Sequence, residues 1–370
     1  MAKRLSINPE VLQFYVNHAE IPFELLQEKC PHINTFLRGE KLPTFNQLSE
    51  VAKKINVPTG LLLLPTPVEI GNKKLEFRTV GSVEIGKMSE NLRDTIADME
   101  RKQNFLKEVI EDELSFLGSL SIEDNIENAA NFLRKLLDLP IKWQSSVESE
   151  AFKFFRSKIN SLGIFVFANG VVGQNNTRTL DTNEFRGFTL ADRKAPLIFI
   201  NSTDSDAGRL FTLVHELVHL LLGNDGIVNK IYLDSYSFSP VEAFVNQVTA
   251  EILLPQSELS LIQDRDISNL ARLFKVSEYV VARRLLDFGE LSINDYQQYV
   301  SDLNDGFEAK KSSQKKSTGG HYYNNINYRI DKTFFHTVRN AIYTDKITYT
   351  QAFDILGLSQ KVFKRMEAQM

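Results

Sequence analysis

The sequence predicts an α+β protein that is mostly helical and contains one small β-sheet. Amphipathic runs with apolar residues three and four positions apart recur through most of the 370 residues and are typical of helices. Three short runs rich in β-branched and aromatic residues are typical of strands, and they fall close together at 163–167, 185–190 and 196–200. With 42% apolar and 24% charged residues, the chain has the composition of a globular protein, neither disordered nor fibrous.

Length, charge and cysteine content narrow the class of protein. A chain of 370 residues exceeds one usual domain, so two or three units are expected. The net charge of −4 argues against binding to nucleic acid by bulk charge, so any DNA contact must be local. The sequence has neither a signal segment nor an apolar run of about 18 residues, which predicts a cytoplasmic protein with no membrane contact. The single cysteine, Cys30, cannot form an intramolecular disulfide and is expected to be a small buried hydrophobe.

Residues 1–66 are predicted to be a compact set of short helices. The run from Glu40 and Leu42-Pro43-Thr44 into Gln47-Leu48 and Ala52-Lys53-Lys54 resembles an XRE-type helix-turn-helix. The expected recognition helix, near 32–38, offers few donors for base edges or phosphates. The sequence therefore leaves open whether this unit binds DNA or docks a protein. The expected helices are 8–19, 22–29, 32–38, 44–55 and 59–64.

Four further segments are expected after this unit. Residues 67–145 are predicted to be a helical linker region, with helices at about 89–113 and 121–137. Residues 146–300 hold a helix near 147–161, the three strands, and a helix-turn-helix-like end at 267–288. Residues 301–320 are expected to be a flexible linker because the run 310–319 is rich in lysine and serine and lacks periodicity. Residues 321–370 are predicted to be a small helical module, with helices near 331–343, 348–356 and 359–367.

The motif that carries chemistry lies on a predicted helix from Asp206 to Leu222, which Gly223 ends. His215 and His219 are four residues apart, so both imidazoles face one side of the helix and can bind one tetrahedral zinc. Glu216 stands beside them, where it can act as general base. This His-Glu-x-x-His pattern would arise by chance in about one sequence in a hundred. The alternative, a metal-free structural histidine pair, is disfavoured by the apolar flanks and the preceding β-run.

A catalytic zinc needs a third protein ligand, and the predicted helix 239–255 supplies a candidate. Its start is marked by Ser239 as N-cap and Pro240 at the first position. Glu242 is the chosen ligand, since Glu251 falls about 180° away from it around the helix. The alternative is that Glu242 completes a capping box with Ser239 and binds no metal. Asn246, one turn on, is placed either to orient a ligand or to pack.

The remaining histidines, which lie in the terminal modules without paired spacing, are expected to be surface or core residues: His18, His32, His321 and His336.

Taken together, these residues resemble the ImmA/IrrE family of zinc metallopeptidases over about 70–295. The resemblance rests on the strand runs, the His-Glu-Leu-Val-His motif and the segment from Glu242 to Pro255. Outside the core motif, Phe77-Arg78-Thr79 and Val276-Ser277 with Arg283-Arg284 agree with longer members that carry an XRE-type module. Three positions depart from the residues of many relatives: Val245, Val248 and Thr249.

The resemblance implies a zincin-like, gluzincin-like core in which His215, His219 and Glu242 hold Zn²⁺ and Glu216 is the catalytic base. It also implies a protein substrate, a transcriptional repressor or similar regulator, in a stress, mobile-element or toxin–antitoxin setting. We expect the substrate peptide to add as a strand at the edge of the small sheet. The loop tyrosines Tyr232 and Tyr236 either reach the site or pack.

Two other functions compete with a regulatory protease. The first is a DNA-binding regulator or antitoxin that uses the metallopeptidase scaffold with little or no proteolysis. The intact motif argues against it, because a scaffold need not retain Glu216. The second is a general peptide-degrading enzyme, which is disfavoured because degradation needs no helix-turn-helix module.

Overall fold

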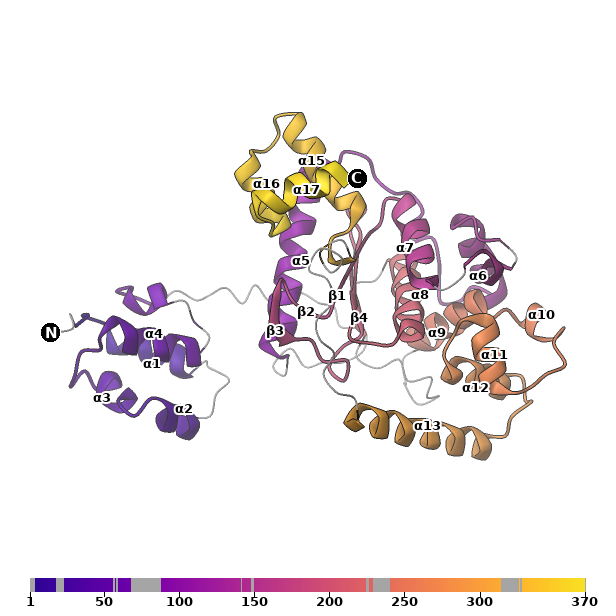
Figure 1. The fold of residues 1–370 in the computed structure, drawn as a ribbon, viewed down its shortest axis with the longest axis horizontal. Coiled ribbons are helices and arrows are strands. Elements are labelled where there is room, and N and C mark those ends of the chain that lie inside the picture. Colours follow the sequence, from indigo (N-terminus) through magenta and orange to yellow (C-terminus); the bar gives the residue numbers. More distant parts are fainter. Residues whose placement is uncertain are drawn as a thin grey trace. The chain divides into compact units, whose positions relative to one another are not determined.

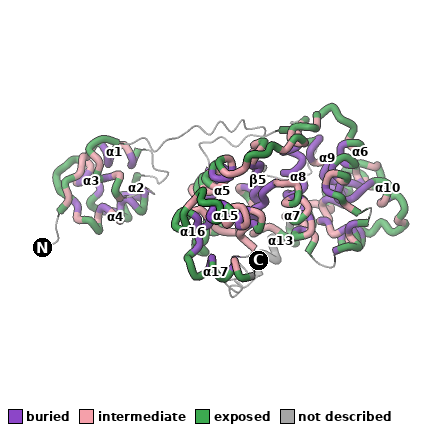
Figure 2. The backbone as a smooth tube through the Cα atoms, turned by 90° about the horizontal axis from the view of Figure 1, so that it is seen from above, coloured by how far each residue is buried: buried purple, intermediate pink, exposed green. Residues whose placement is uncertain are grey.

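The computed structural model describes residues 4–17, 23–55, 57, 59–67, 88–140, 142–147, 150–223, 226–228, 240–313, 326 and 328–369. The chain divides into two compact units, Met1–Phe77 and Arg78–Met370. Each unit has a hydrophobic core of its own, visible as the buried positions in Figure 2.

The first unit is helical, as its sequence predicts. Its elements are α1 (Pro9–Asn17), α2 (Phe23–Lys29), α3 (Ile33–Leu37), α4 (Phe45–Lys54) and the 3₁₀ turn η1 (Thr59–Leu63). Helix α4 begins with a capping box in which the Thr44 hydroxyl and the Gln47 side chain satisfy each other's backbone N–H groups. Cys30 is buried in the core of this unit, as expected of a small hydrophobe.

The second unit is built around a mixed four-stranded sheet in the order β1-β5-β4-β6. Strand β1 (Phe165–Asn169) pairs in parallel with β5 (Leu197–Asn201), and β4 (Gly187–Leu190) is antiparallel to β5. A short strand, β6 (Gly226–Val228), pairs with the other side of β4. The three apolar runs in the sequence therefore became β1, β4 and β5, within two residues of their expected starts.

Helices cover both faces of this sheet (Figure 1). On one face, Ile198 and Ile200 of β5 join the core formed with α7 (Ala151–Ser161), α8 (Asp206–Leu222) and α9 (Pro240–Leu253). On the other face, Phe167 contacts Phe334 of α15 (Lys332–Tyr343), beside α5 (Glu90–Val109). Successive residues of a strand point to opposite faces, so one short strand contributes to both layers.

The other elements complete the helical surroundings of the sheet. They are α6 (Ile126–Leu136), η3 (Trp143–Ser146), β2 (Val171–Val172), β3 (Asn175–Thr179), α10 (Gln256–Leu259), α11 (Ile267–Phe274), α12 (Glu278–Asp287), α13 (Ile293–Ser313), α16 (Tyr349–Leu356) and α17 (Gln360–Gln369). The sequence did not predict the polar hairpin β2–β3, because its residues do not alternate in hydrophobicity.

One segment differs from its expected structure. Residues 301–313, assigned from the sequence to a flexible linker, form the second half of α13. The helix has few apolar positions, so its period is weak in the sequence. The rest of the expected linker, 314–320, lies outside the described residues. Among the helices described, none is long and apolar enough to cross a membrane.

Candidate metal and catalytic site

Helix α8 positions the His-Glu-Leu-Val-His motif. The Ser205 hydroxyl caps its start, and Gly223, with a φ of 73°, ends it in the left-handed conformation that favours glycine. His215 and His219 lie one turn apart with ring centroids 4.8 Å from each other, and their Nε2 atoms are 3.1 Å apart. Both imidazoles are buried, at 1% and 2% exposure, so the pair lies in the interior of the unit.

Glu242 reaches this histidine pair from α9. Its Oε2 lies 3.3 Å from Nε2 of His215, and its Oε1 lies 3.2 Å from Nε2 of His219. The structure therefore brings together His215, His219 and Glu242, from two helices, as one cluster that can hold a metal ion.

Other residues of α9 lie where the helical spacing predicts. Glu251 points away from the cluster and forms an ion pair with Arg284. Burial lowers the pKa of His215, and Asn246 contributes the smallest of the effects that oppose this shift. Even so, Asn246 Oδ1 and His215 Nδ1 are both buried without a hydrogen-bond partner among the described residues. Val245, Val248 and Thr249, on the same helix, are fully buried.

The histidines that the sequence assigns to the surface or the core do not join the cluster where the structure describes them. His32 belongs to the first unit and His336 to α15, and the described residues show no second metal-ligand cluster around either. The other predicted residues lie outside the described part of the chain: His18, Phe77, Arg78, Thr79, Tyr232, Tyr236, Ser239 and His321.

The side chains of the cluster shift one another's pKa values. Burial alone would raise the pKa of Glu242, but the contacts with His215 and His219 outweigh burial and hold it far below the usual range. Burial lowers the pKa of His215. Burial also works to lower the pKa of His219, but Glu242 and Glu216 raise it on balance. Glu242 thus stays ionised and available as an anionic ligand.

Glu216 differs from Glu242 in its surroundings. Its side chain is fully buried, and burial raises its pKa from 4.5 to about 7. Its Oε2 accepts a hydrogen bond of 2.5 Å from the hydroxyl of Thr189, while its Oε1 has no hydrogen-bond partner in the described part of the chain. A carboxyl group with a pKa near neutrality and one free oxygen can both accept and return a proton.

Thr189 was not predicted from the sequence. It lies inside the strand run 185–190, and no spacing in that run distinguishes it from a packing residue. The close approach of β4 to α8 brings it to Glu216, and this approach depends on Gly187. A Cβ at Gly187 would lie 2.6 Å from Cγ2 of Thr212 and 2.9 Å from the carbonyl oxygen of Phe199.

Comparison with known proteins bears on the segment that holds this cluster. No protein of curated function matches the chain, and no solved structure does. A family model described as Peptidase_M78, the IrrE N-terminal-like domain, matches residues 159–286. The matched residues run from the end of α7 to α12 and include His215, Glu216, His219 and Glu242. The match supports a metallopeptidase of the ImmA/IrrE type over this part of the chain.

Proposed function

We propose that the protein is a zinc-dependent endopeptidase in which His215, His219 and Glu242 hold the metal. The observation that carries this proposal is the spacing of the ligand groups. The two histidine Nε2 atoms are 3.1 Å apart, and each lies 3.2 or 3.3 Å from one of the two carboxylate oxygens of Glu242. Ligands about 2.0–2.1 Å from a tetrahedral zinc are about 3.3 Å from one another, so the residues present fit this ion. Three protein ligands also leave the fourth position for water or substrate, as in catalytic zinc sites.

Glu216 is the general base in this proposal. Bound zinc would supply Lewis-acid polarisation of the scissile carbonyl and a lowered pKa for water. Glu216 would take the proton from the attacking water and give one to the leaving amine. Its raised pKa, near 7, suits both transfers, and Thr189 leaves one of its carboxylate oxygens free.

The substrate peptide is proposed to add as a strand beside β6. Strand β6 pairs with β4 on one side, and among the described residues no strand pairs with its other side. Gly226 of β6 lies opposite Thr189, the residue that contacts Glu216. A peptide paired with β6 would thus run past the catalytic carboxylate with its own backbone hydrogen bonds satisfied.

The proposed substrate is a regulatory protein in the cytoplasm, such as a transcriptional repressor, in a stress, mobile-element or toxin–antitoxin setting. The separate N-terminal unit supports this, because a compact module on the same chain can tether a partner or DNA and raise the effective concentration of substrate. The competing function is a DNA-binding regulator or antitoxin with little proteolysis. The buried Glu216, beside a complete ligand set, favours the protease.

The test combines metal content with cleavage of a defined protein. We expect the purified protein to hold about one zinc per chain. If the gene beside its own encodes an XRE-type repressor, we expect the protein to cleave that repressor. Glu216→Gln should retain the zinc and abolish cleavage, whereas Glu127→Gln, on the exposed surface of α6, should leave both unchanged. A Glu216→Gln protein that cleaves like the parent would contradict the mechanism. Absence of zinc would contradict the site.

A further inference from the structure

A second site candidate lies on the opposite face of the sheet. It is a cavity of about 380 Å³, a size typical of pockets for small molecules. Aromatic rings form its apolar wall: Phe167 of β1, Phe199 of β5 and Phe334 of α15. The cluster of His215, His219 and Glu242 lies on the α8 side of the same sheet, and the two sites share no residue.

The polar wall of the cavity carries excess positive charge. Its ionic groups, among the described residues, are Arg101 and Lys102 of α5, Arg329, and one carboxylate, Asp98. A second carboxylate, Asp354, pairs with Arg101, so three cations stand beside two carboxylates. An aromatic wall beside one net positive charge favours a ligand that has an apolar ring and a negative charge.

Lys102 provides the most specific indication. Its side chain is 11% exposed and lies over the ring of Phe167, with Nζ 5.8 Å from the ring centroid. An ammonium group has three N–H donors, and in the described part of the chain its hydrogen-bond partner is Asp98 alone. The other two N–H groups have no hydrogen-bond partner among the described residues. Because leaving buried donors unpaired is costly, an anion that accepts from them would be stabilised. Burial also lowers the pKa of Lys102, while Asp98 works to keep the ammonium charged.

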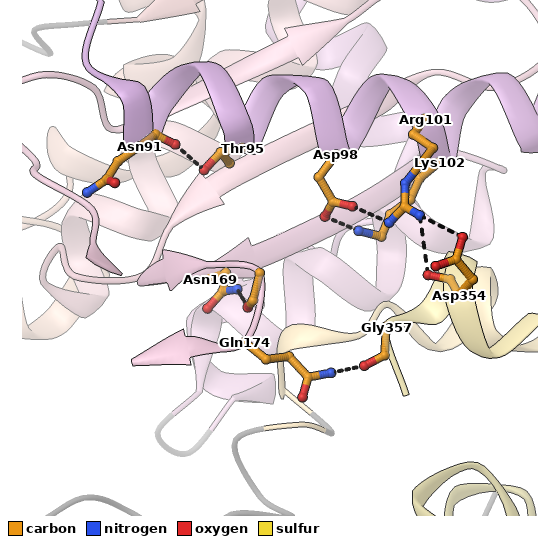
Figure 3. Close-up of polar contacts among 10 residues, drawn as sticks. Asn91, Thr95, Asp98, Arg101, Lys102, Asn169, Gln174, Asp354 and Gly357 are labelled. Carbon is orange, nitrogen blue, oxygen red and sulfur yellow. Dashed lines mark hydrogen bonds and ion pairs between the residues drawn. The ribbon is translucent and has the colours of Figure 1, made fainter. Parts of the chain in front are cut away.

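Polar contacts join segments that are far apart in the sequence, and Figure 3 shows those made by Arg101 and Gln174. Arg101 of α5 donates to Oδ2 of Asp354 at 3.2 Å and to the Asp354 carbonyl oxygen at 3.3 Å. Gln174, in the β2–β3 turn, donates to the carbonyl oxygen of Gly357. Polar contacts thus join the C-terminal helices to α5 and to the β2–β3 hairpin around the space.

We propose that this cavity binds a small aromatic anion, an aromatic ring system that carries a carboxylate, sulfonate or phosphate group. The ring lies in the apolar part of the cavity, beside Phe167 and Phe199, and the anionic group accepts hydrogen bonds from Lys102, with Arg329 adding positive charge. This site does not depend on the proposed peptidase activity.

The probe for the test is 2-naphthoate, titrated calorimetrically into the full-length protein. We expect saturable binding of one molecule per chain, at least tenfold tighter than binding of the neutral isostere 2-naphthamide, because hydrogen bonds to a charged group are the stronger ones. No saturable binding, or equal affinity for the acid and the amide, would overturn the proposal.

Variants locate the site. Lys102→Met should weaken naphthoate binding at least tenfold, and Arg329→Gln should weaken it severalfold. Lys107→Met is the matched control, because Lys107 lies on the same helix but pairs with Asp192 outside the cavity. The double variant Asp98→Asn with Lys102→Met removes the ion pair without leaving the Asp98 carboxylate unpaired by a lysine. Thermal unfolding reports whether each variant folds. Undiminished binding in both Lys102→Met and Arg329→Gln would contradict the assignment.

Discussion

The Thr189 hydroxyl on β4 donates a hydrogen bond to Oε2 of Glu216 on α8, across the contact between sheet and helix. The same hydroxyl lies 3.3 Å from the backbone carbonyl oxygen of Glu216. This contact fixes the orientation of the carboxyl group and lowers its pKa, against the larger, opposite effect of burial. Thr189 is therefore expected to act as a positioning residue for the general base.

Removing this hydrogen bond should shift the pH profile of peptide cleavage. Thr189→Val keeps the shape of the side chain but lacks the donor, so the pKa of Glu216 should rise. The acid limb of kcat/KM should then move to higher pH, with a loss in kcat of about tenfold. Thr189→Ser, which retains a hydroxyl, should behave nearly like the parent. The positioning role would be refuted if the valine variant kept the parental pH profile.

The buried Glu216 should also make the metal-free protein less stable as pH rises. Its pKa in the folded protein, about 7, exceeds its ordinary value of 4.5, so the folded state favours the protonated carboxyl. Stability from this group is fully present below pH 4.5 and is lost as pH rises through about 7. The shift corresponds to about 3 kcal/mol in the free energy of unfolding. Chemical denaturation of chelator-treated parent and Glu216→Gln from pH 5 to 8 measures it, and parallel curves would contradict it.

The variant Glu242→Gln distinguishes the two possible roles of this residue, a zinc ligand or part of a capping box. Glutamine serves as well as glutamate in a capping box, so a purely structural Glu242 should tolerate the change. A neutral amide is a poor ligand for zinc, so a metal-binding Glu242 should lose zinc affinity by about a hundredfold or more. Zinc titration monitored by a competing chelator gives the affinity, with Glu127→Gln as control. Zinc affinity equal to that of the parent would favour the cap.

Gly187→Ala should destabilise the second unit. The added Cβ would lie 2.6 Å from Thr212 Cγ2 and 2.9 Å from the backbone oxygen of Phe199, so β4 must move away from α8. We expect a loss of about 1–3 kcal/mol, typical of overpacking, together with reduced cleavage. Gly306→Ala on α13 is the control, because a Cβ there meets nothing within 4 Å and alanine favours a helix. Urea denaturation of both variants tests the contrast.

Local periodicity predicts much of this fold and of the candidate site. The expected bounds of α8 agree with the structure, because Gly223 ends a clear apolar period. The expected orientation of Glu242 also agrees, since helical geometry alone separates it from Glu251. Thr189 and the cavity beside Lys102 could not be predicted in this way, because each depends on contacts between segments distant in the chain. Likewise, α13 has too weak a pattern to be told from a linker.

Strand β5 lies between two chemically different environments. Ile198 and Ile200 pack in the core with α8, the helix of the histidine pair, while Phe199, between them, lines the cavity on the other face. A shift of one residue in the pairing of β5 would exchange these faces, placing the phenylalanine against α8 and isoleucines against the cavity. Apolar substitutions of similar volume at single positions of 197–200 are therefore tolerable. Insertion or deletion of one residue there would disrupt both faces at once.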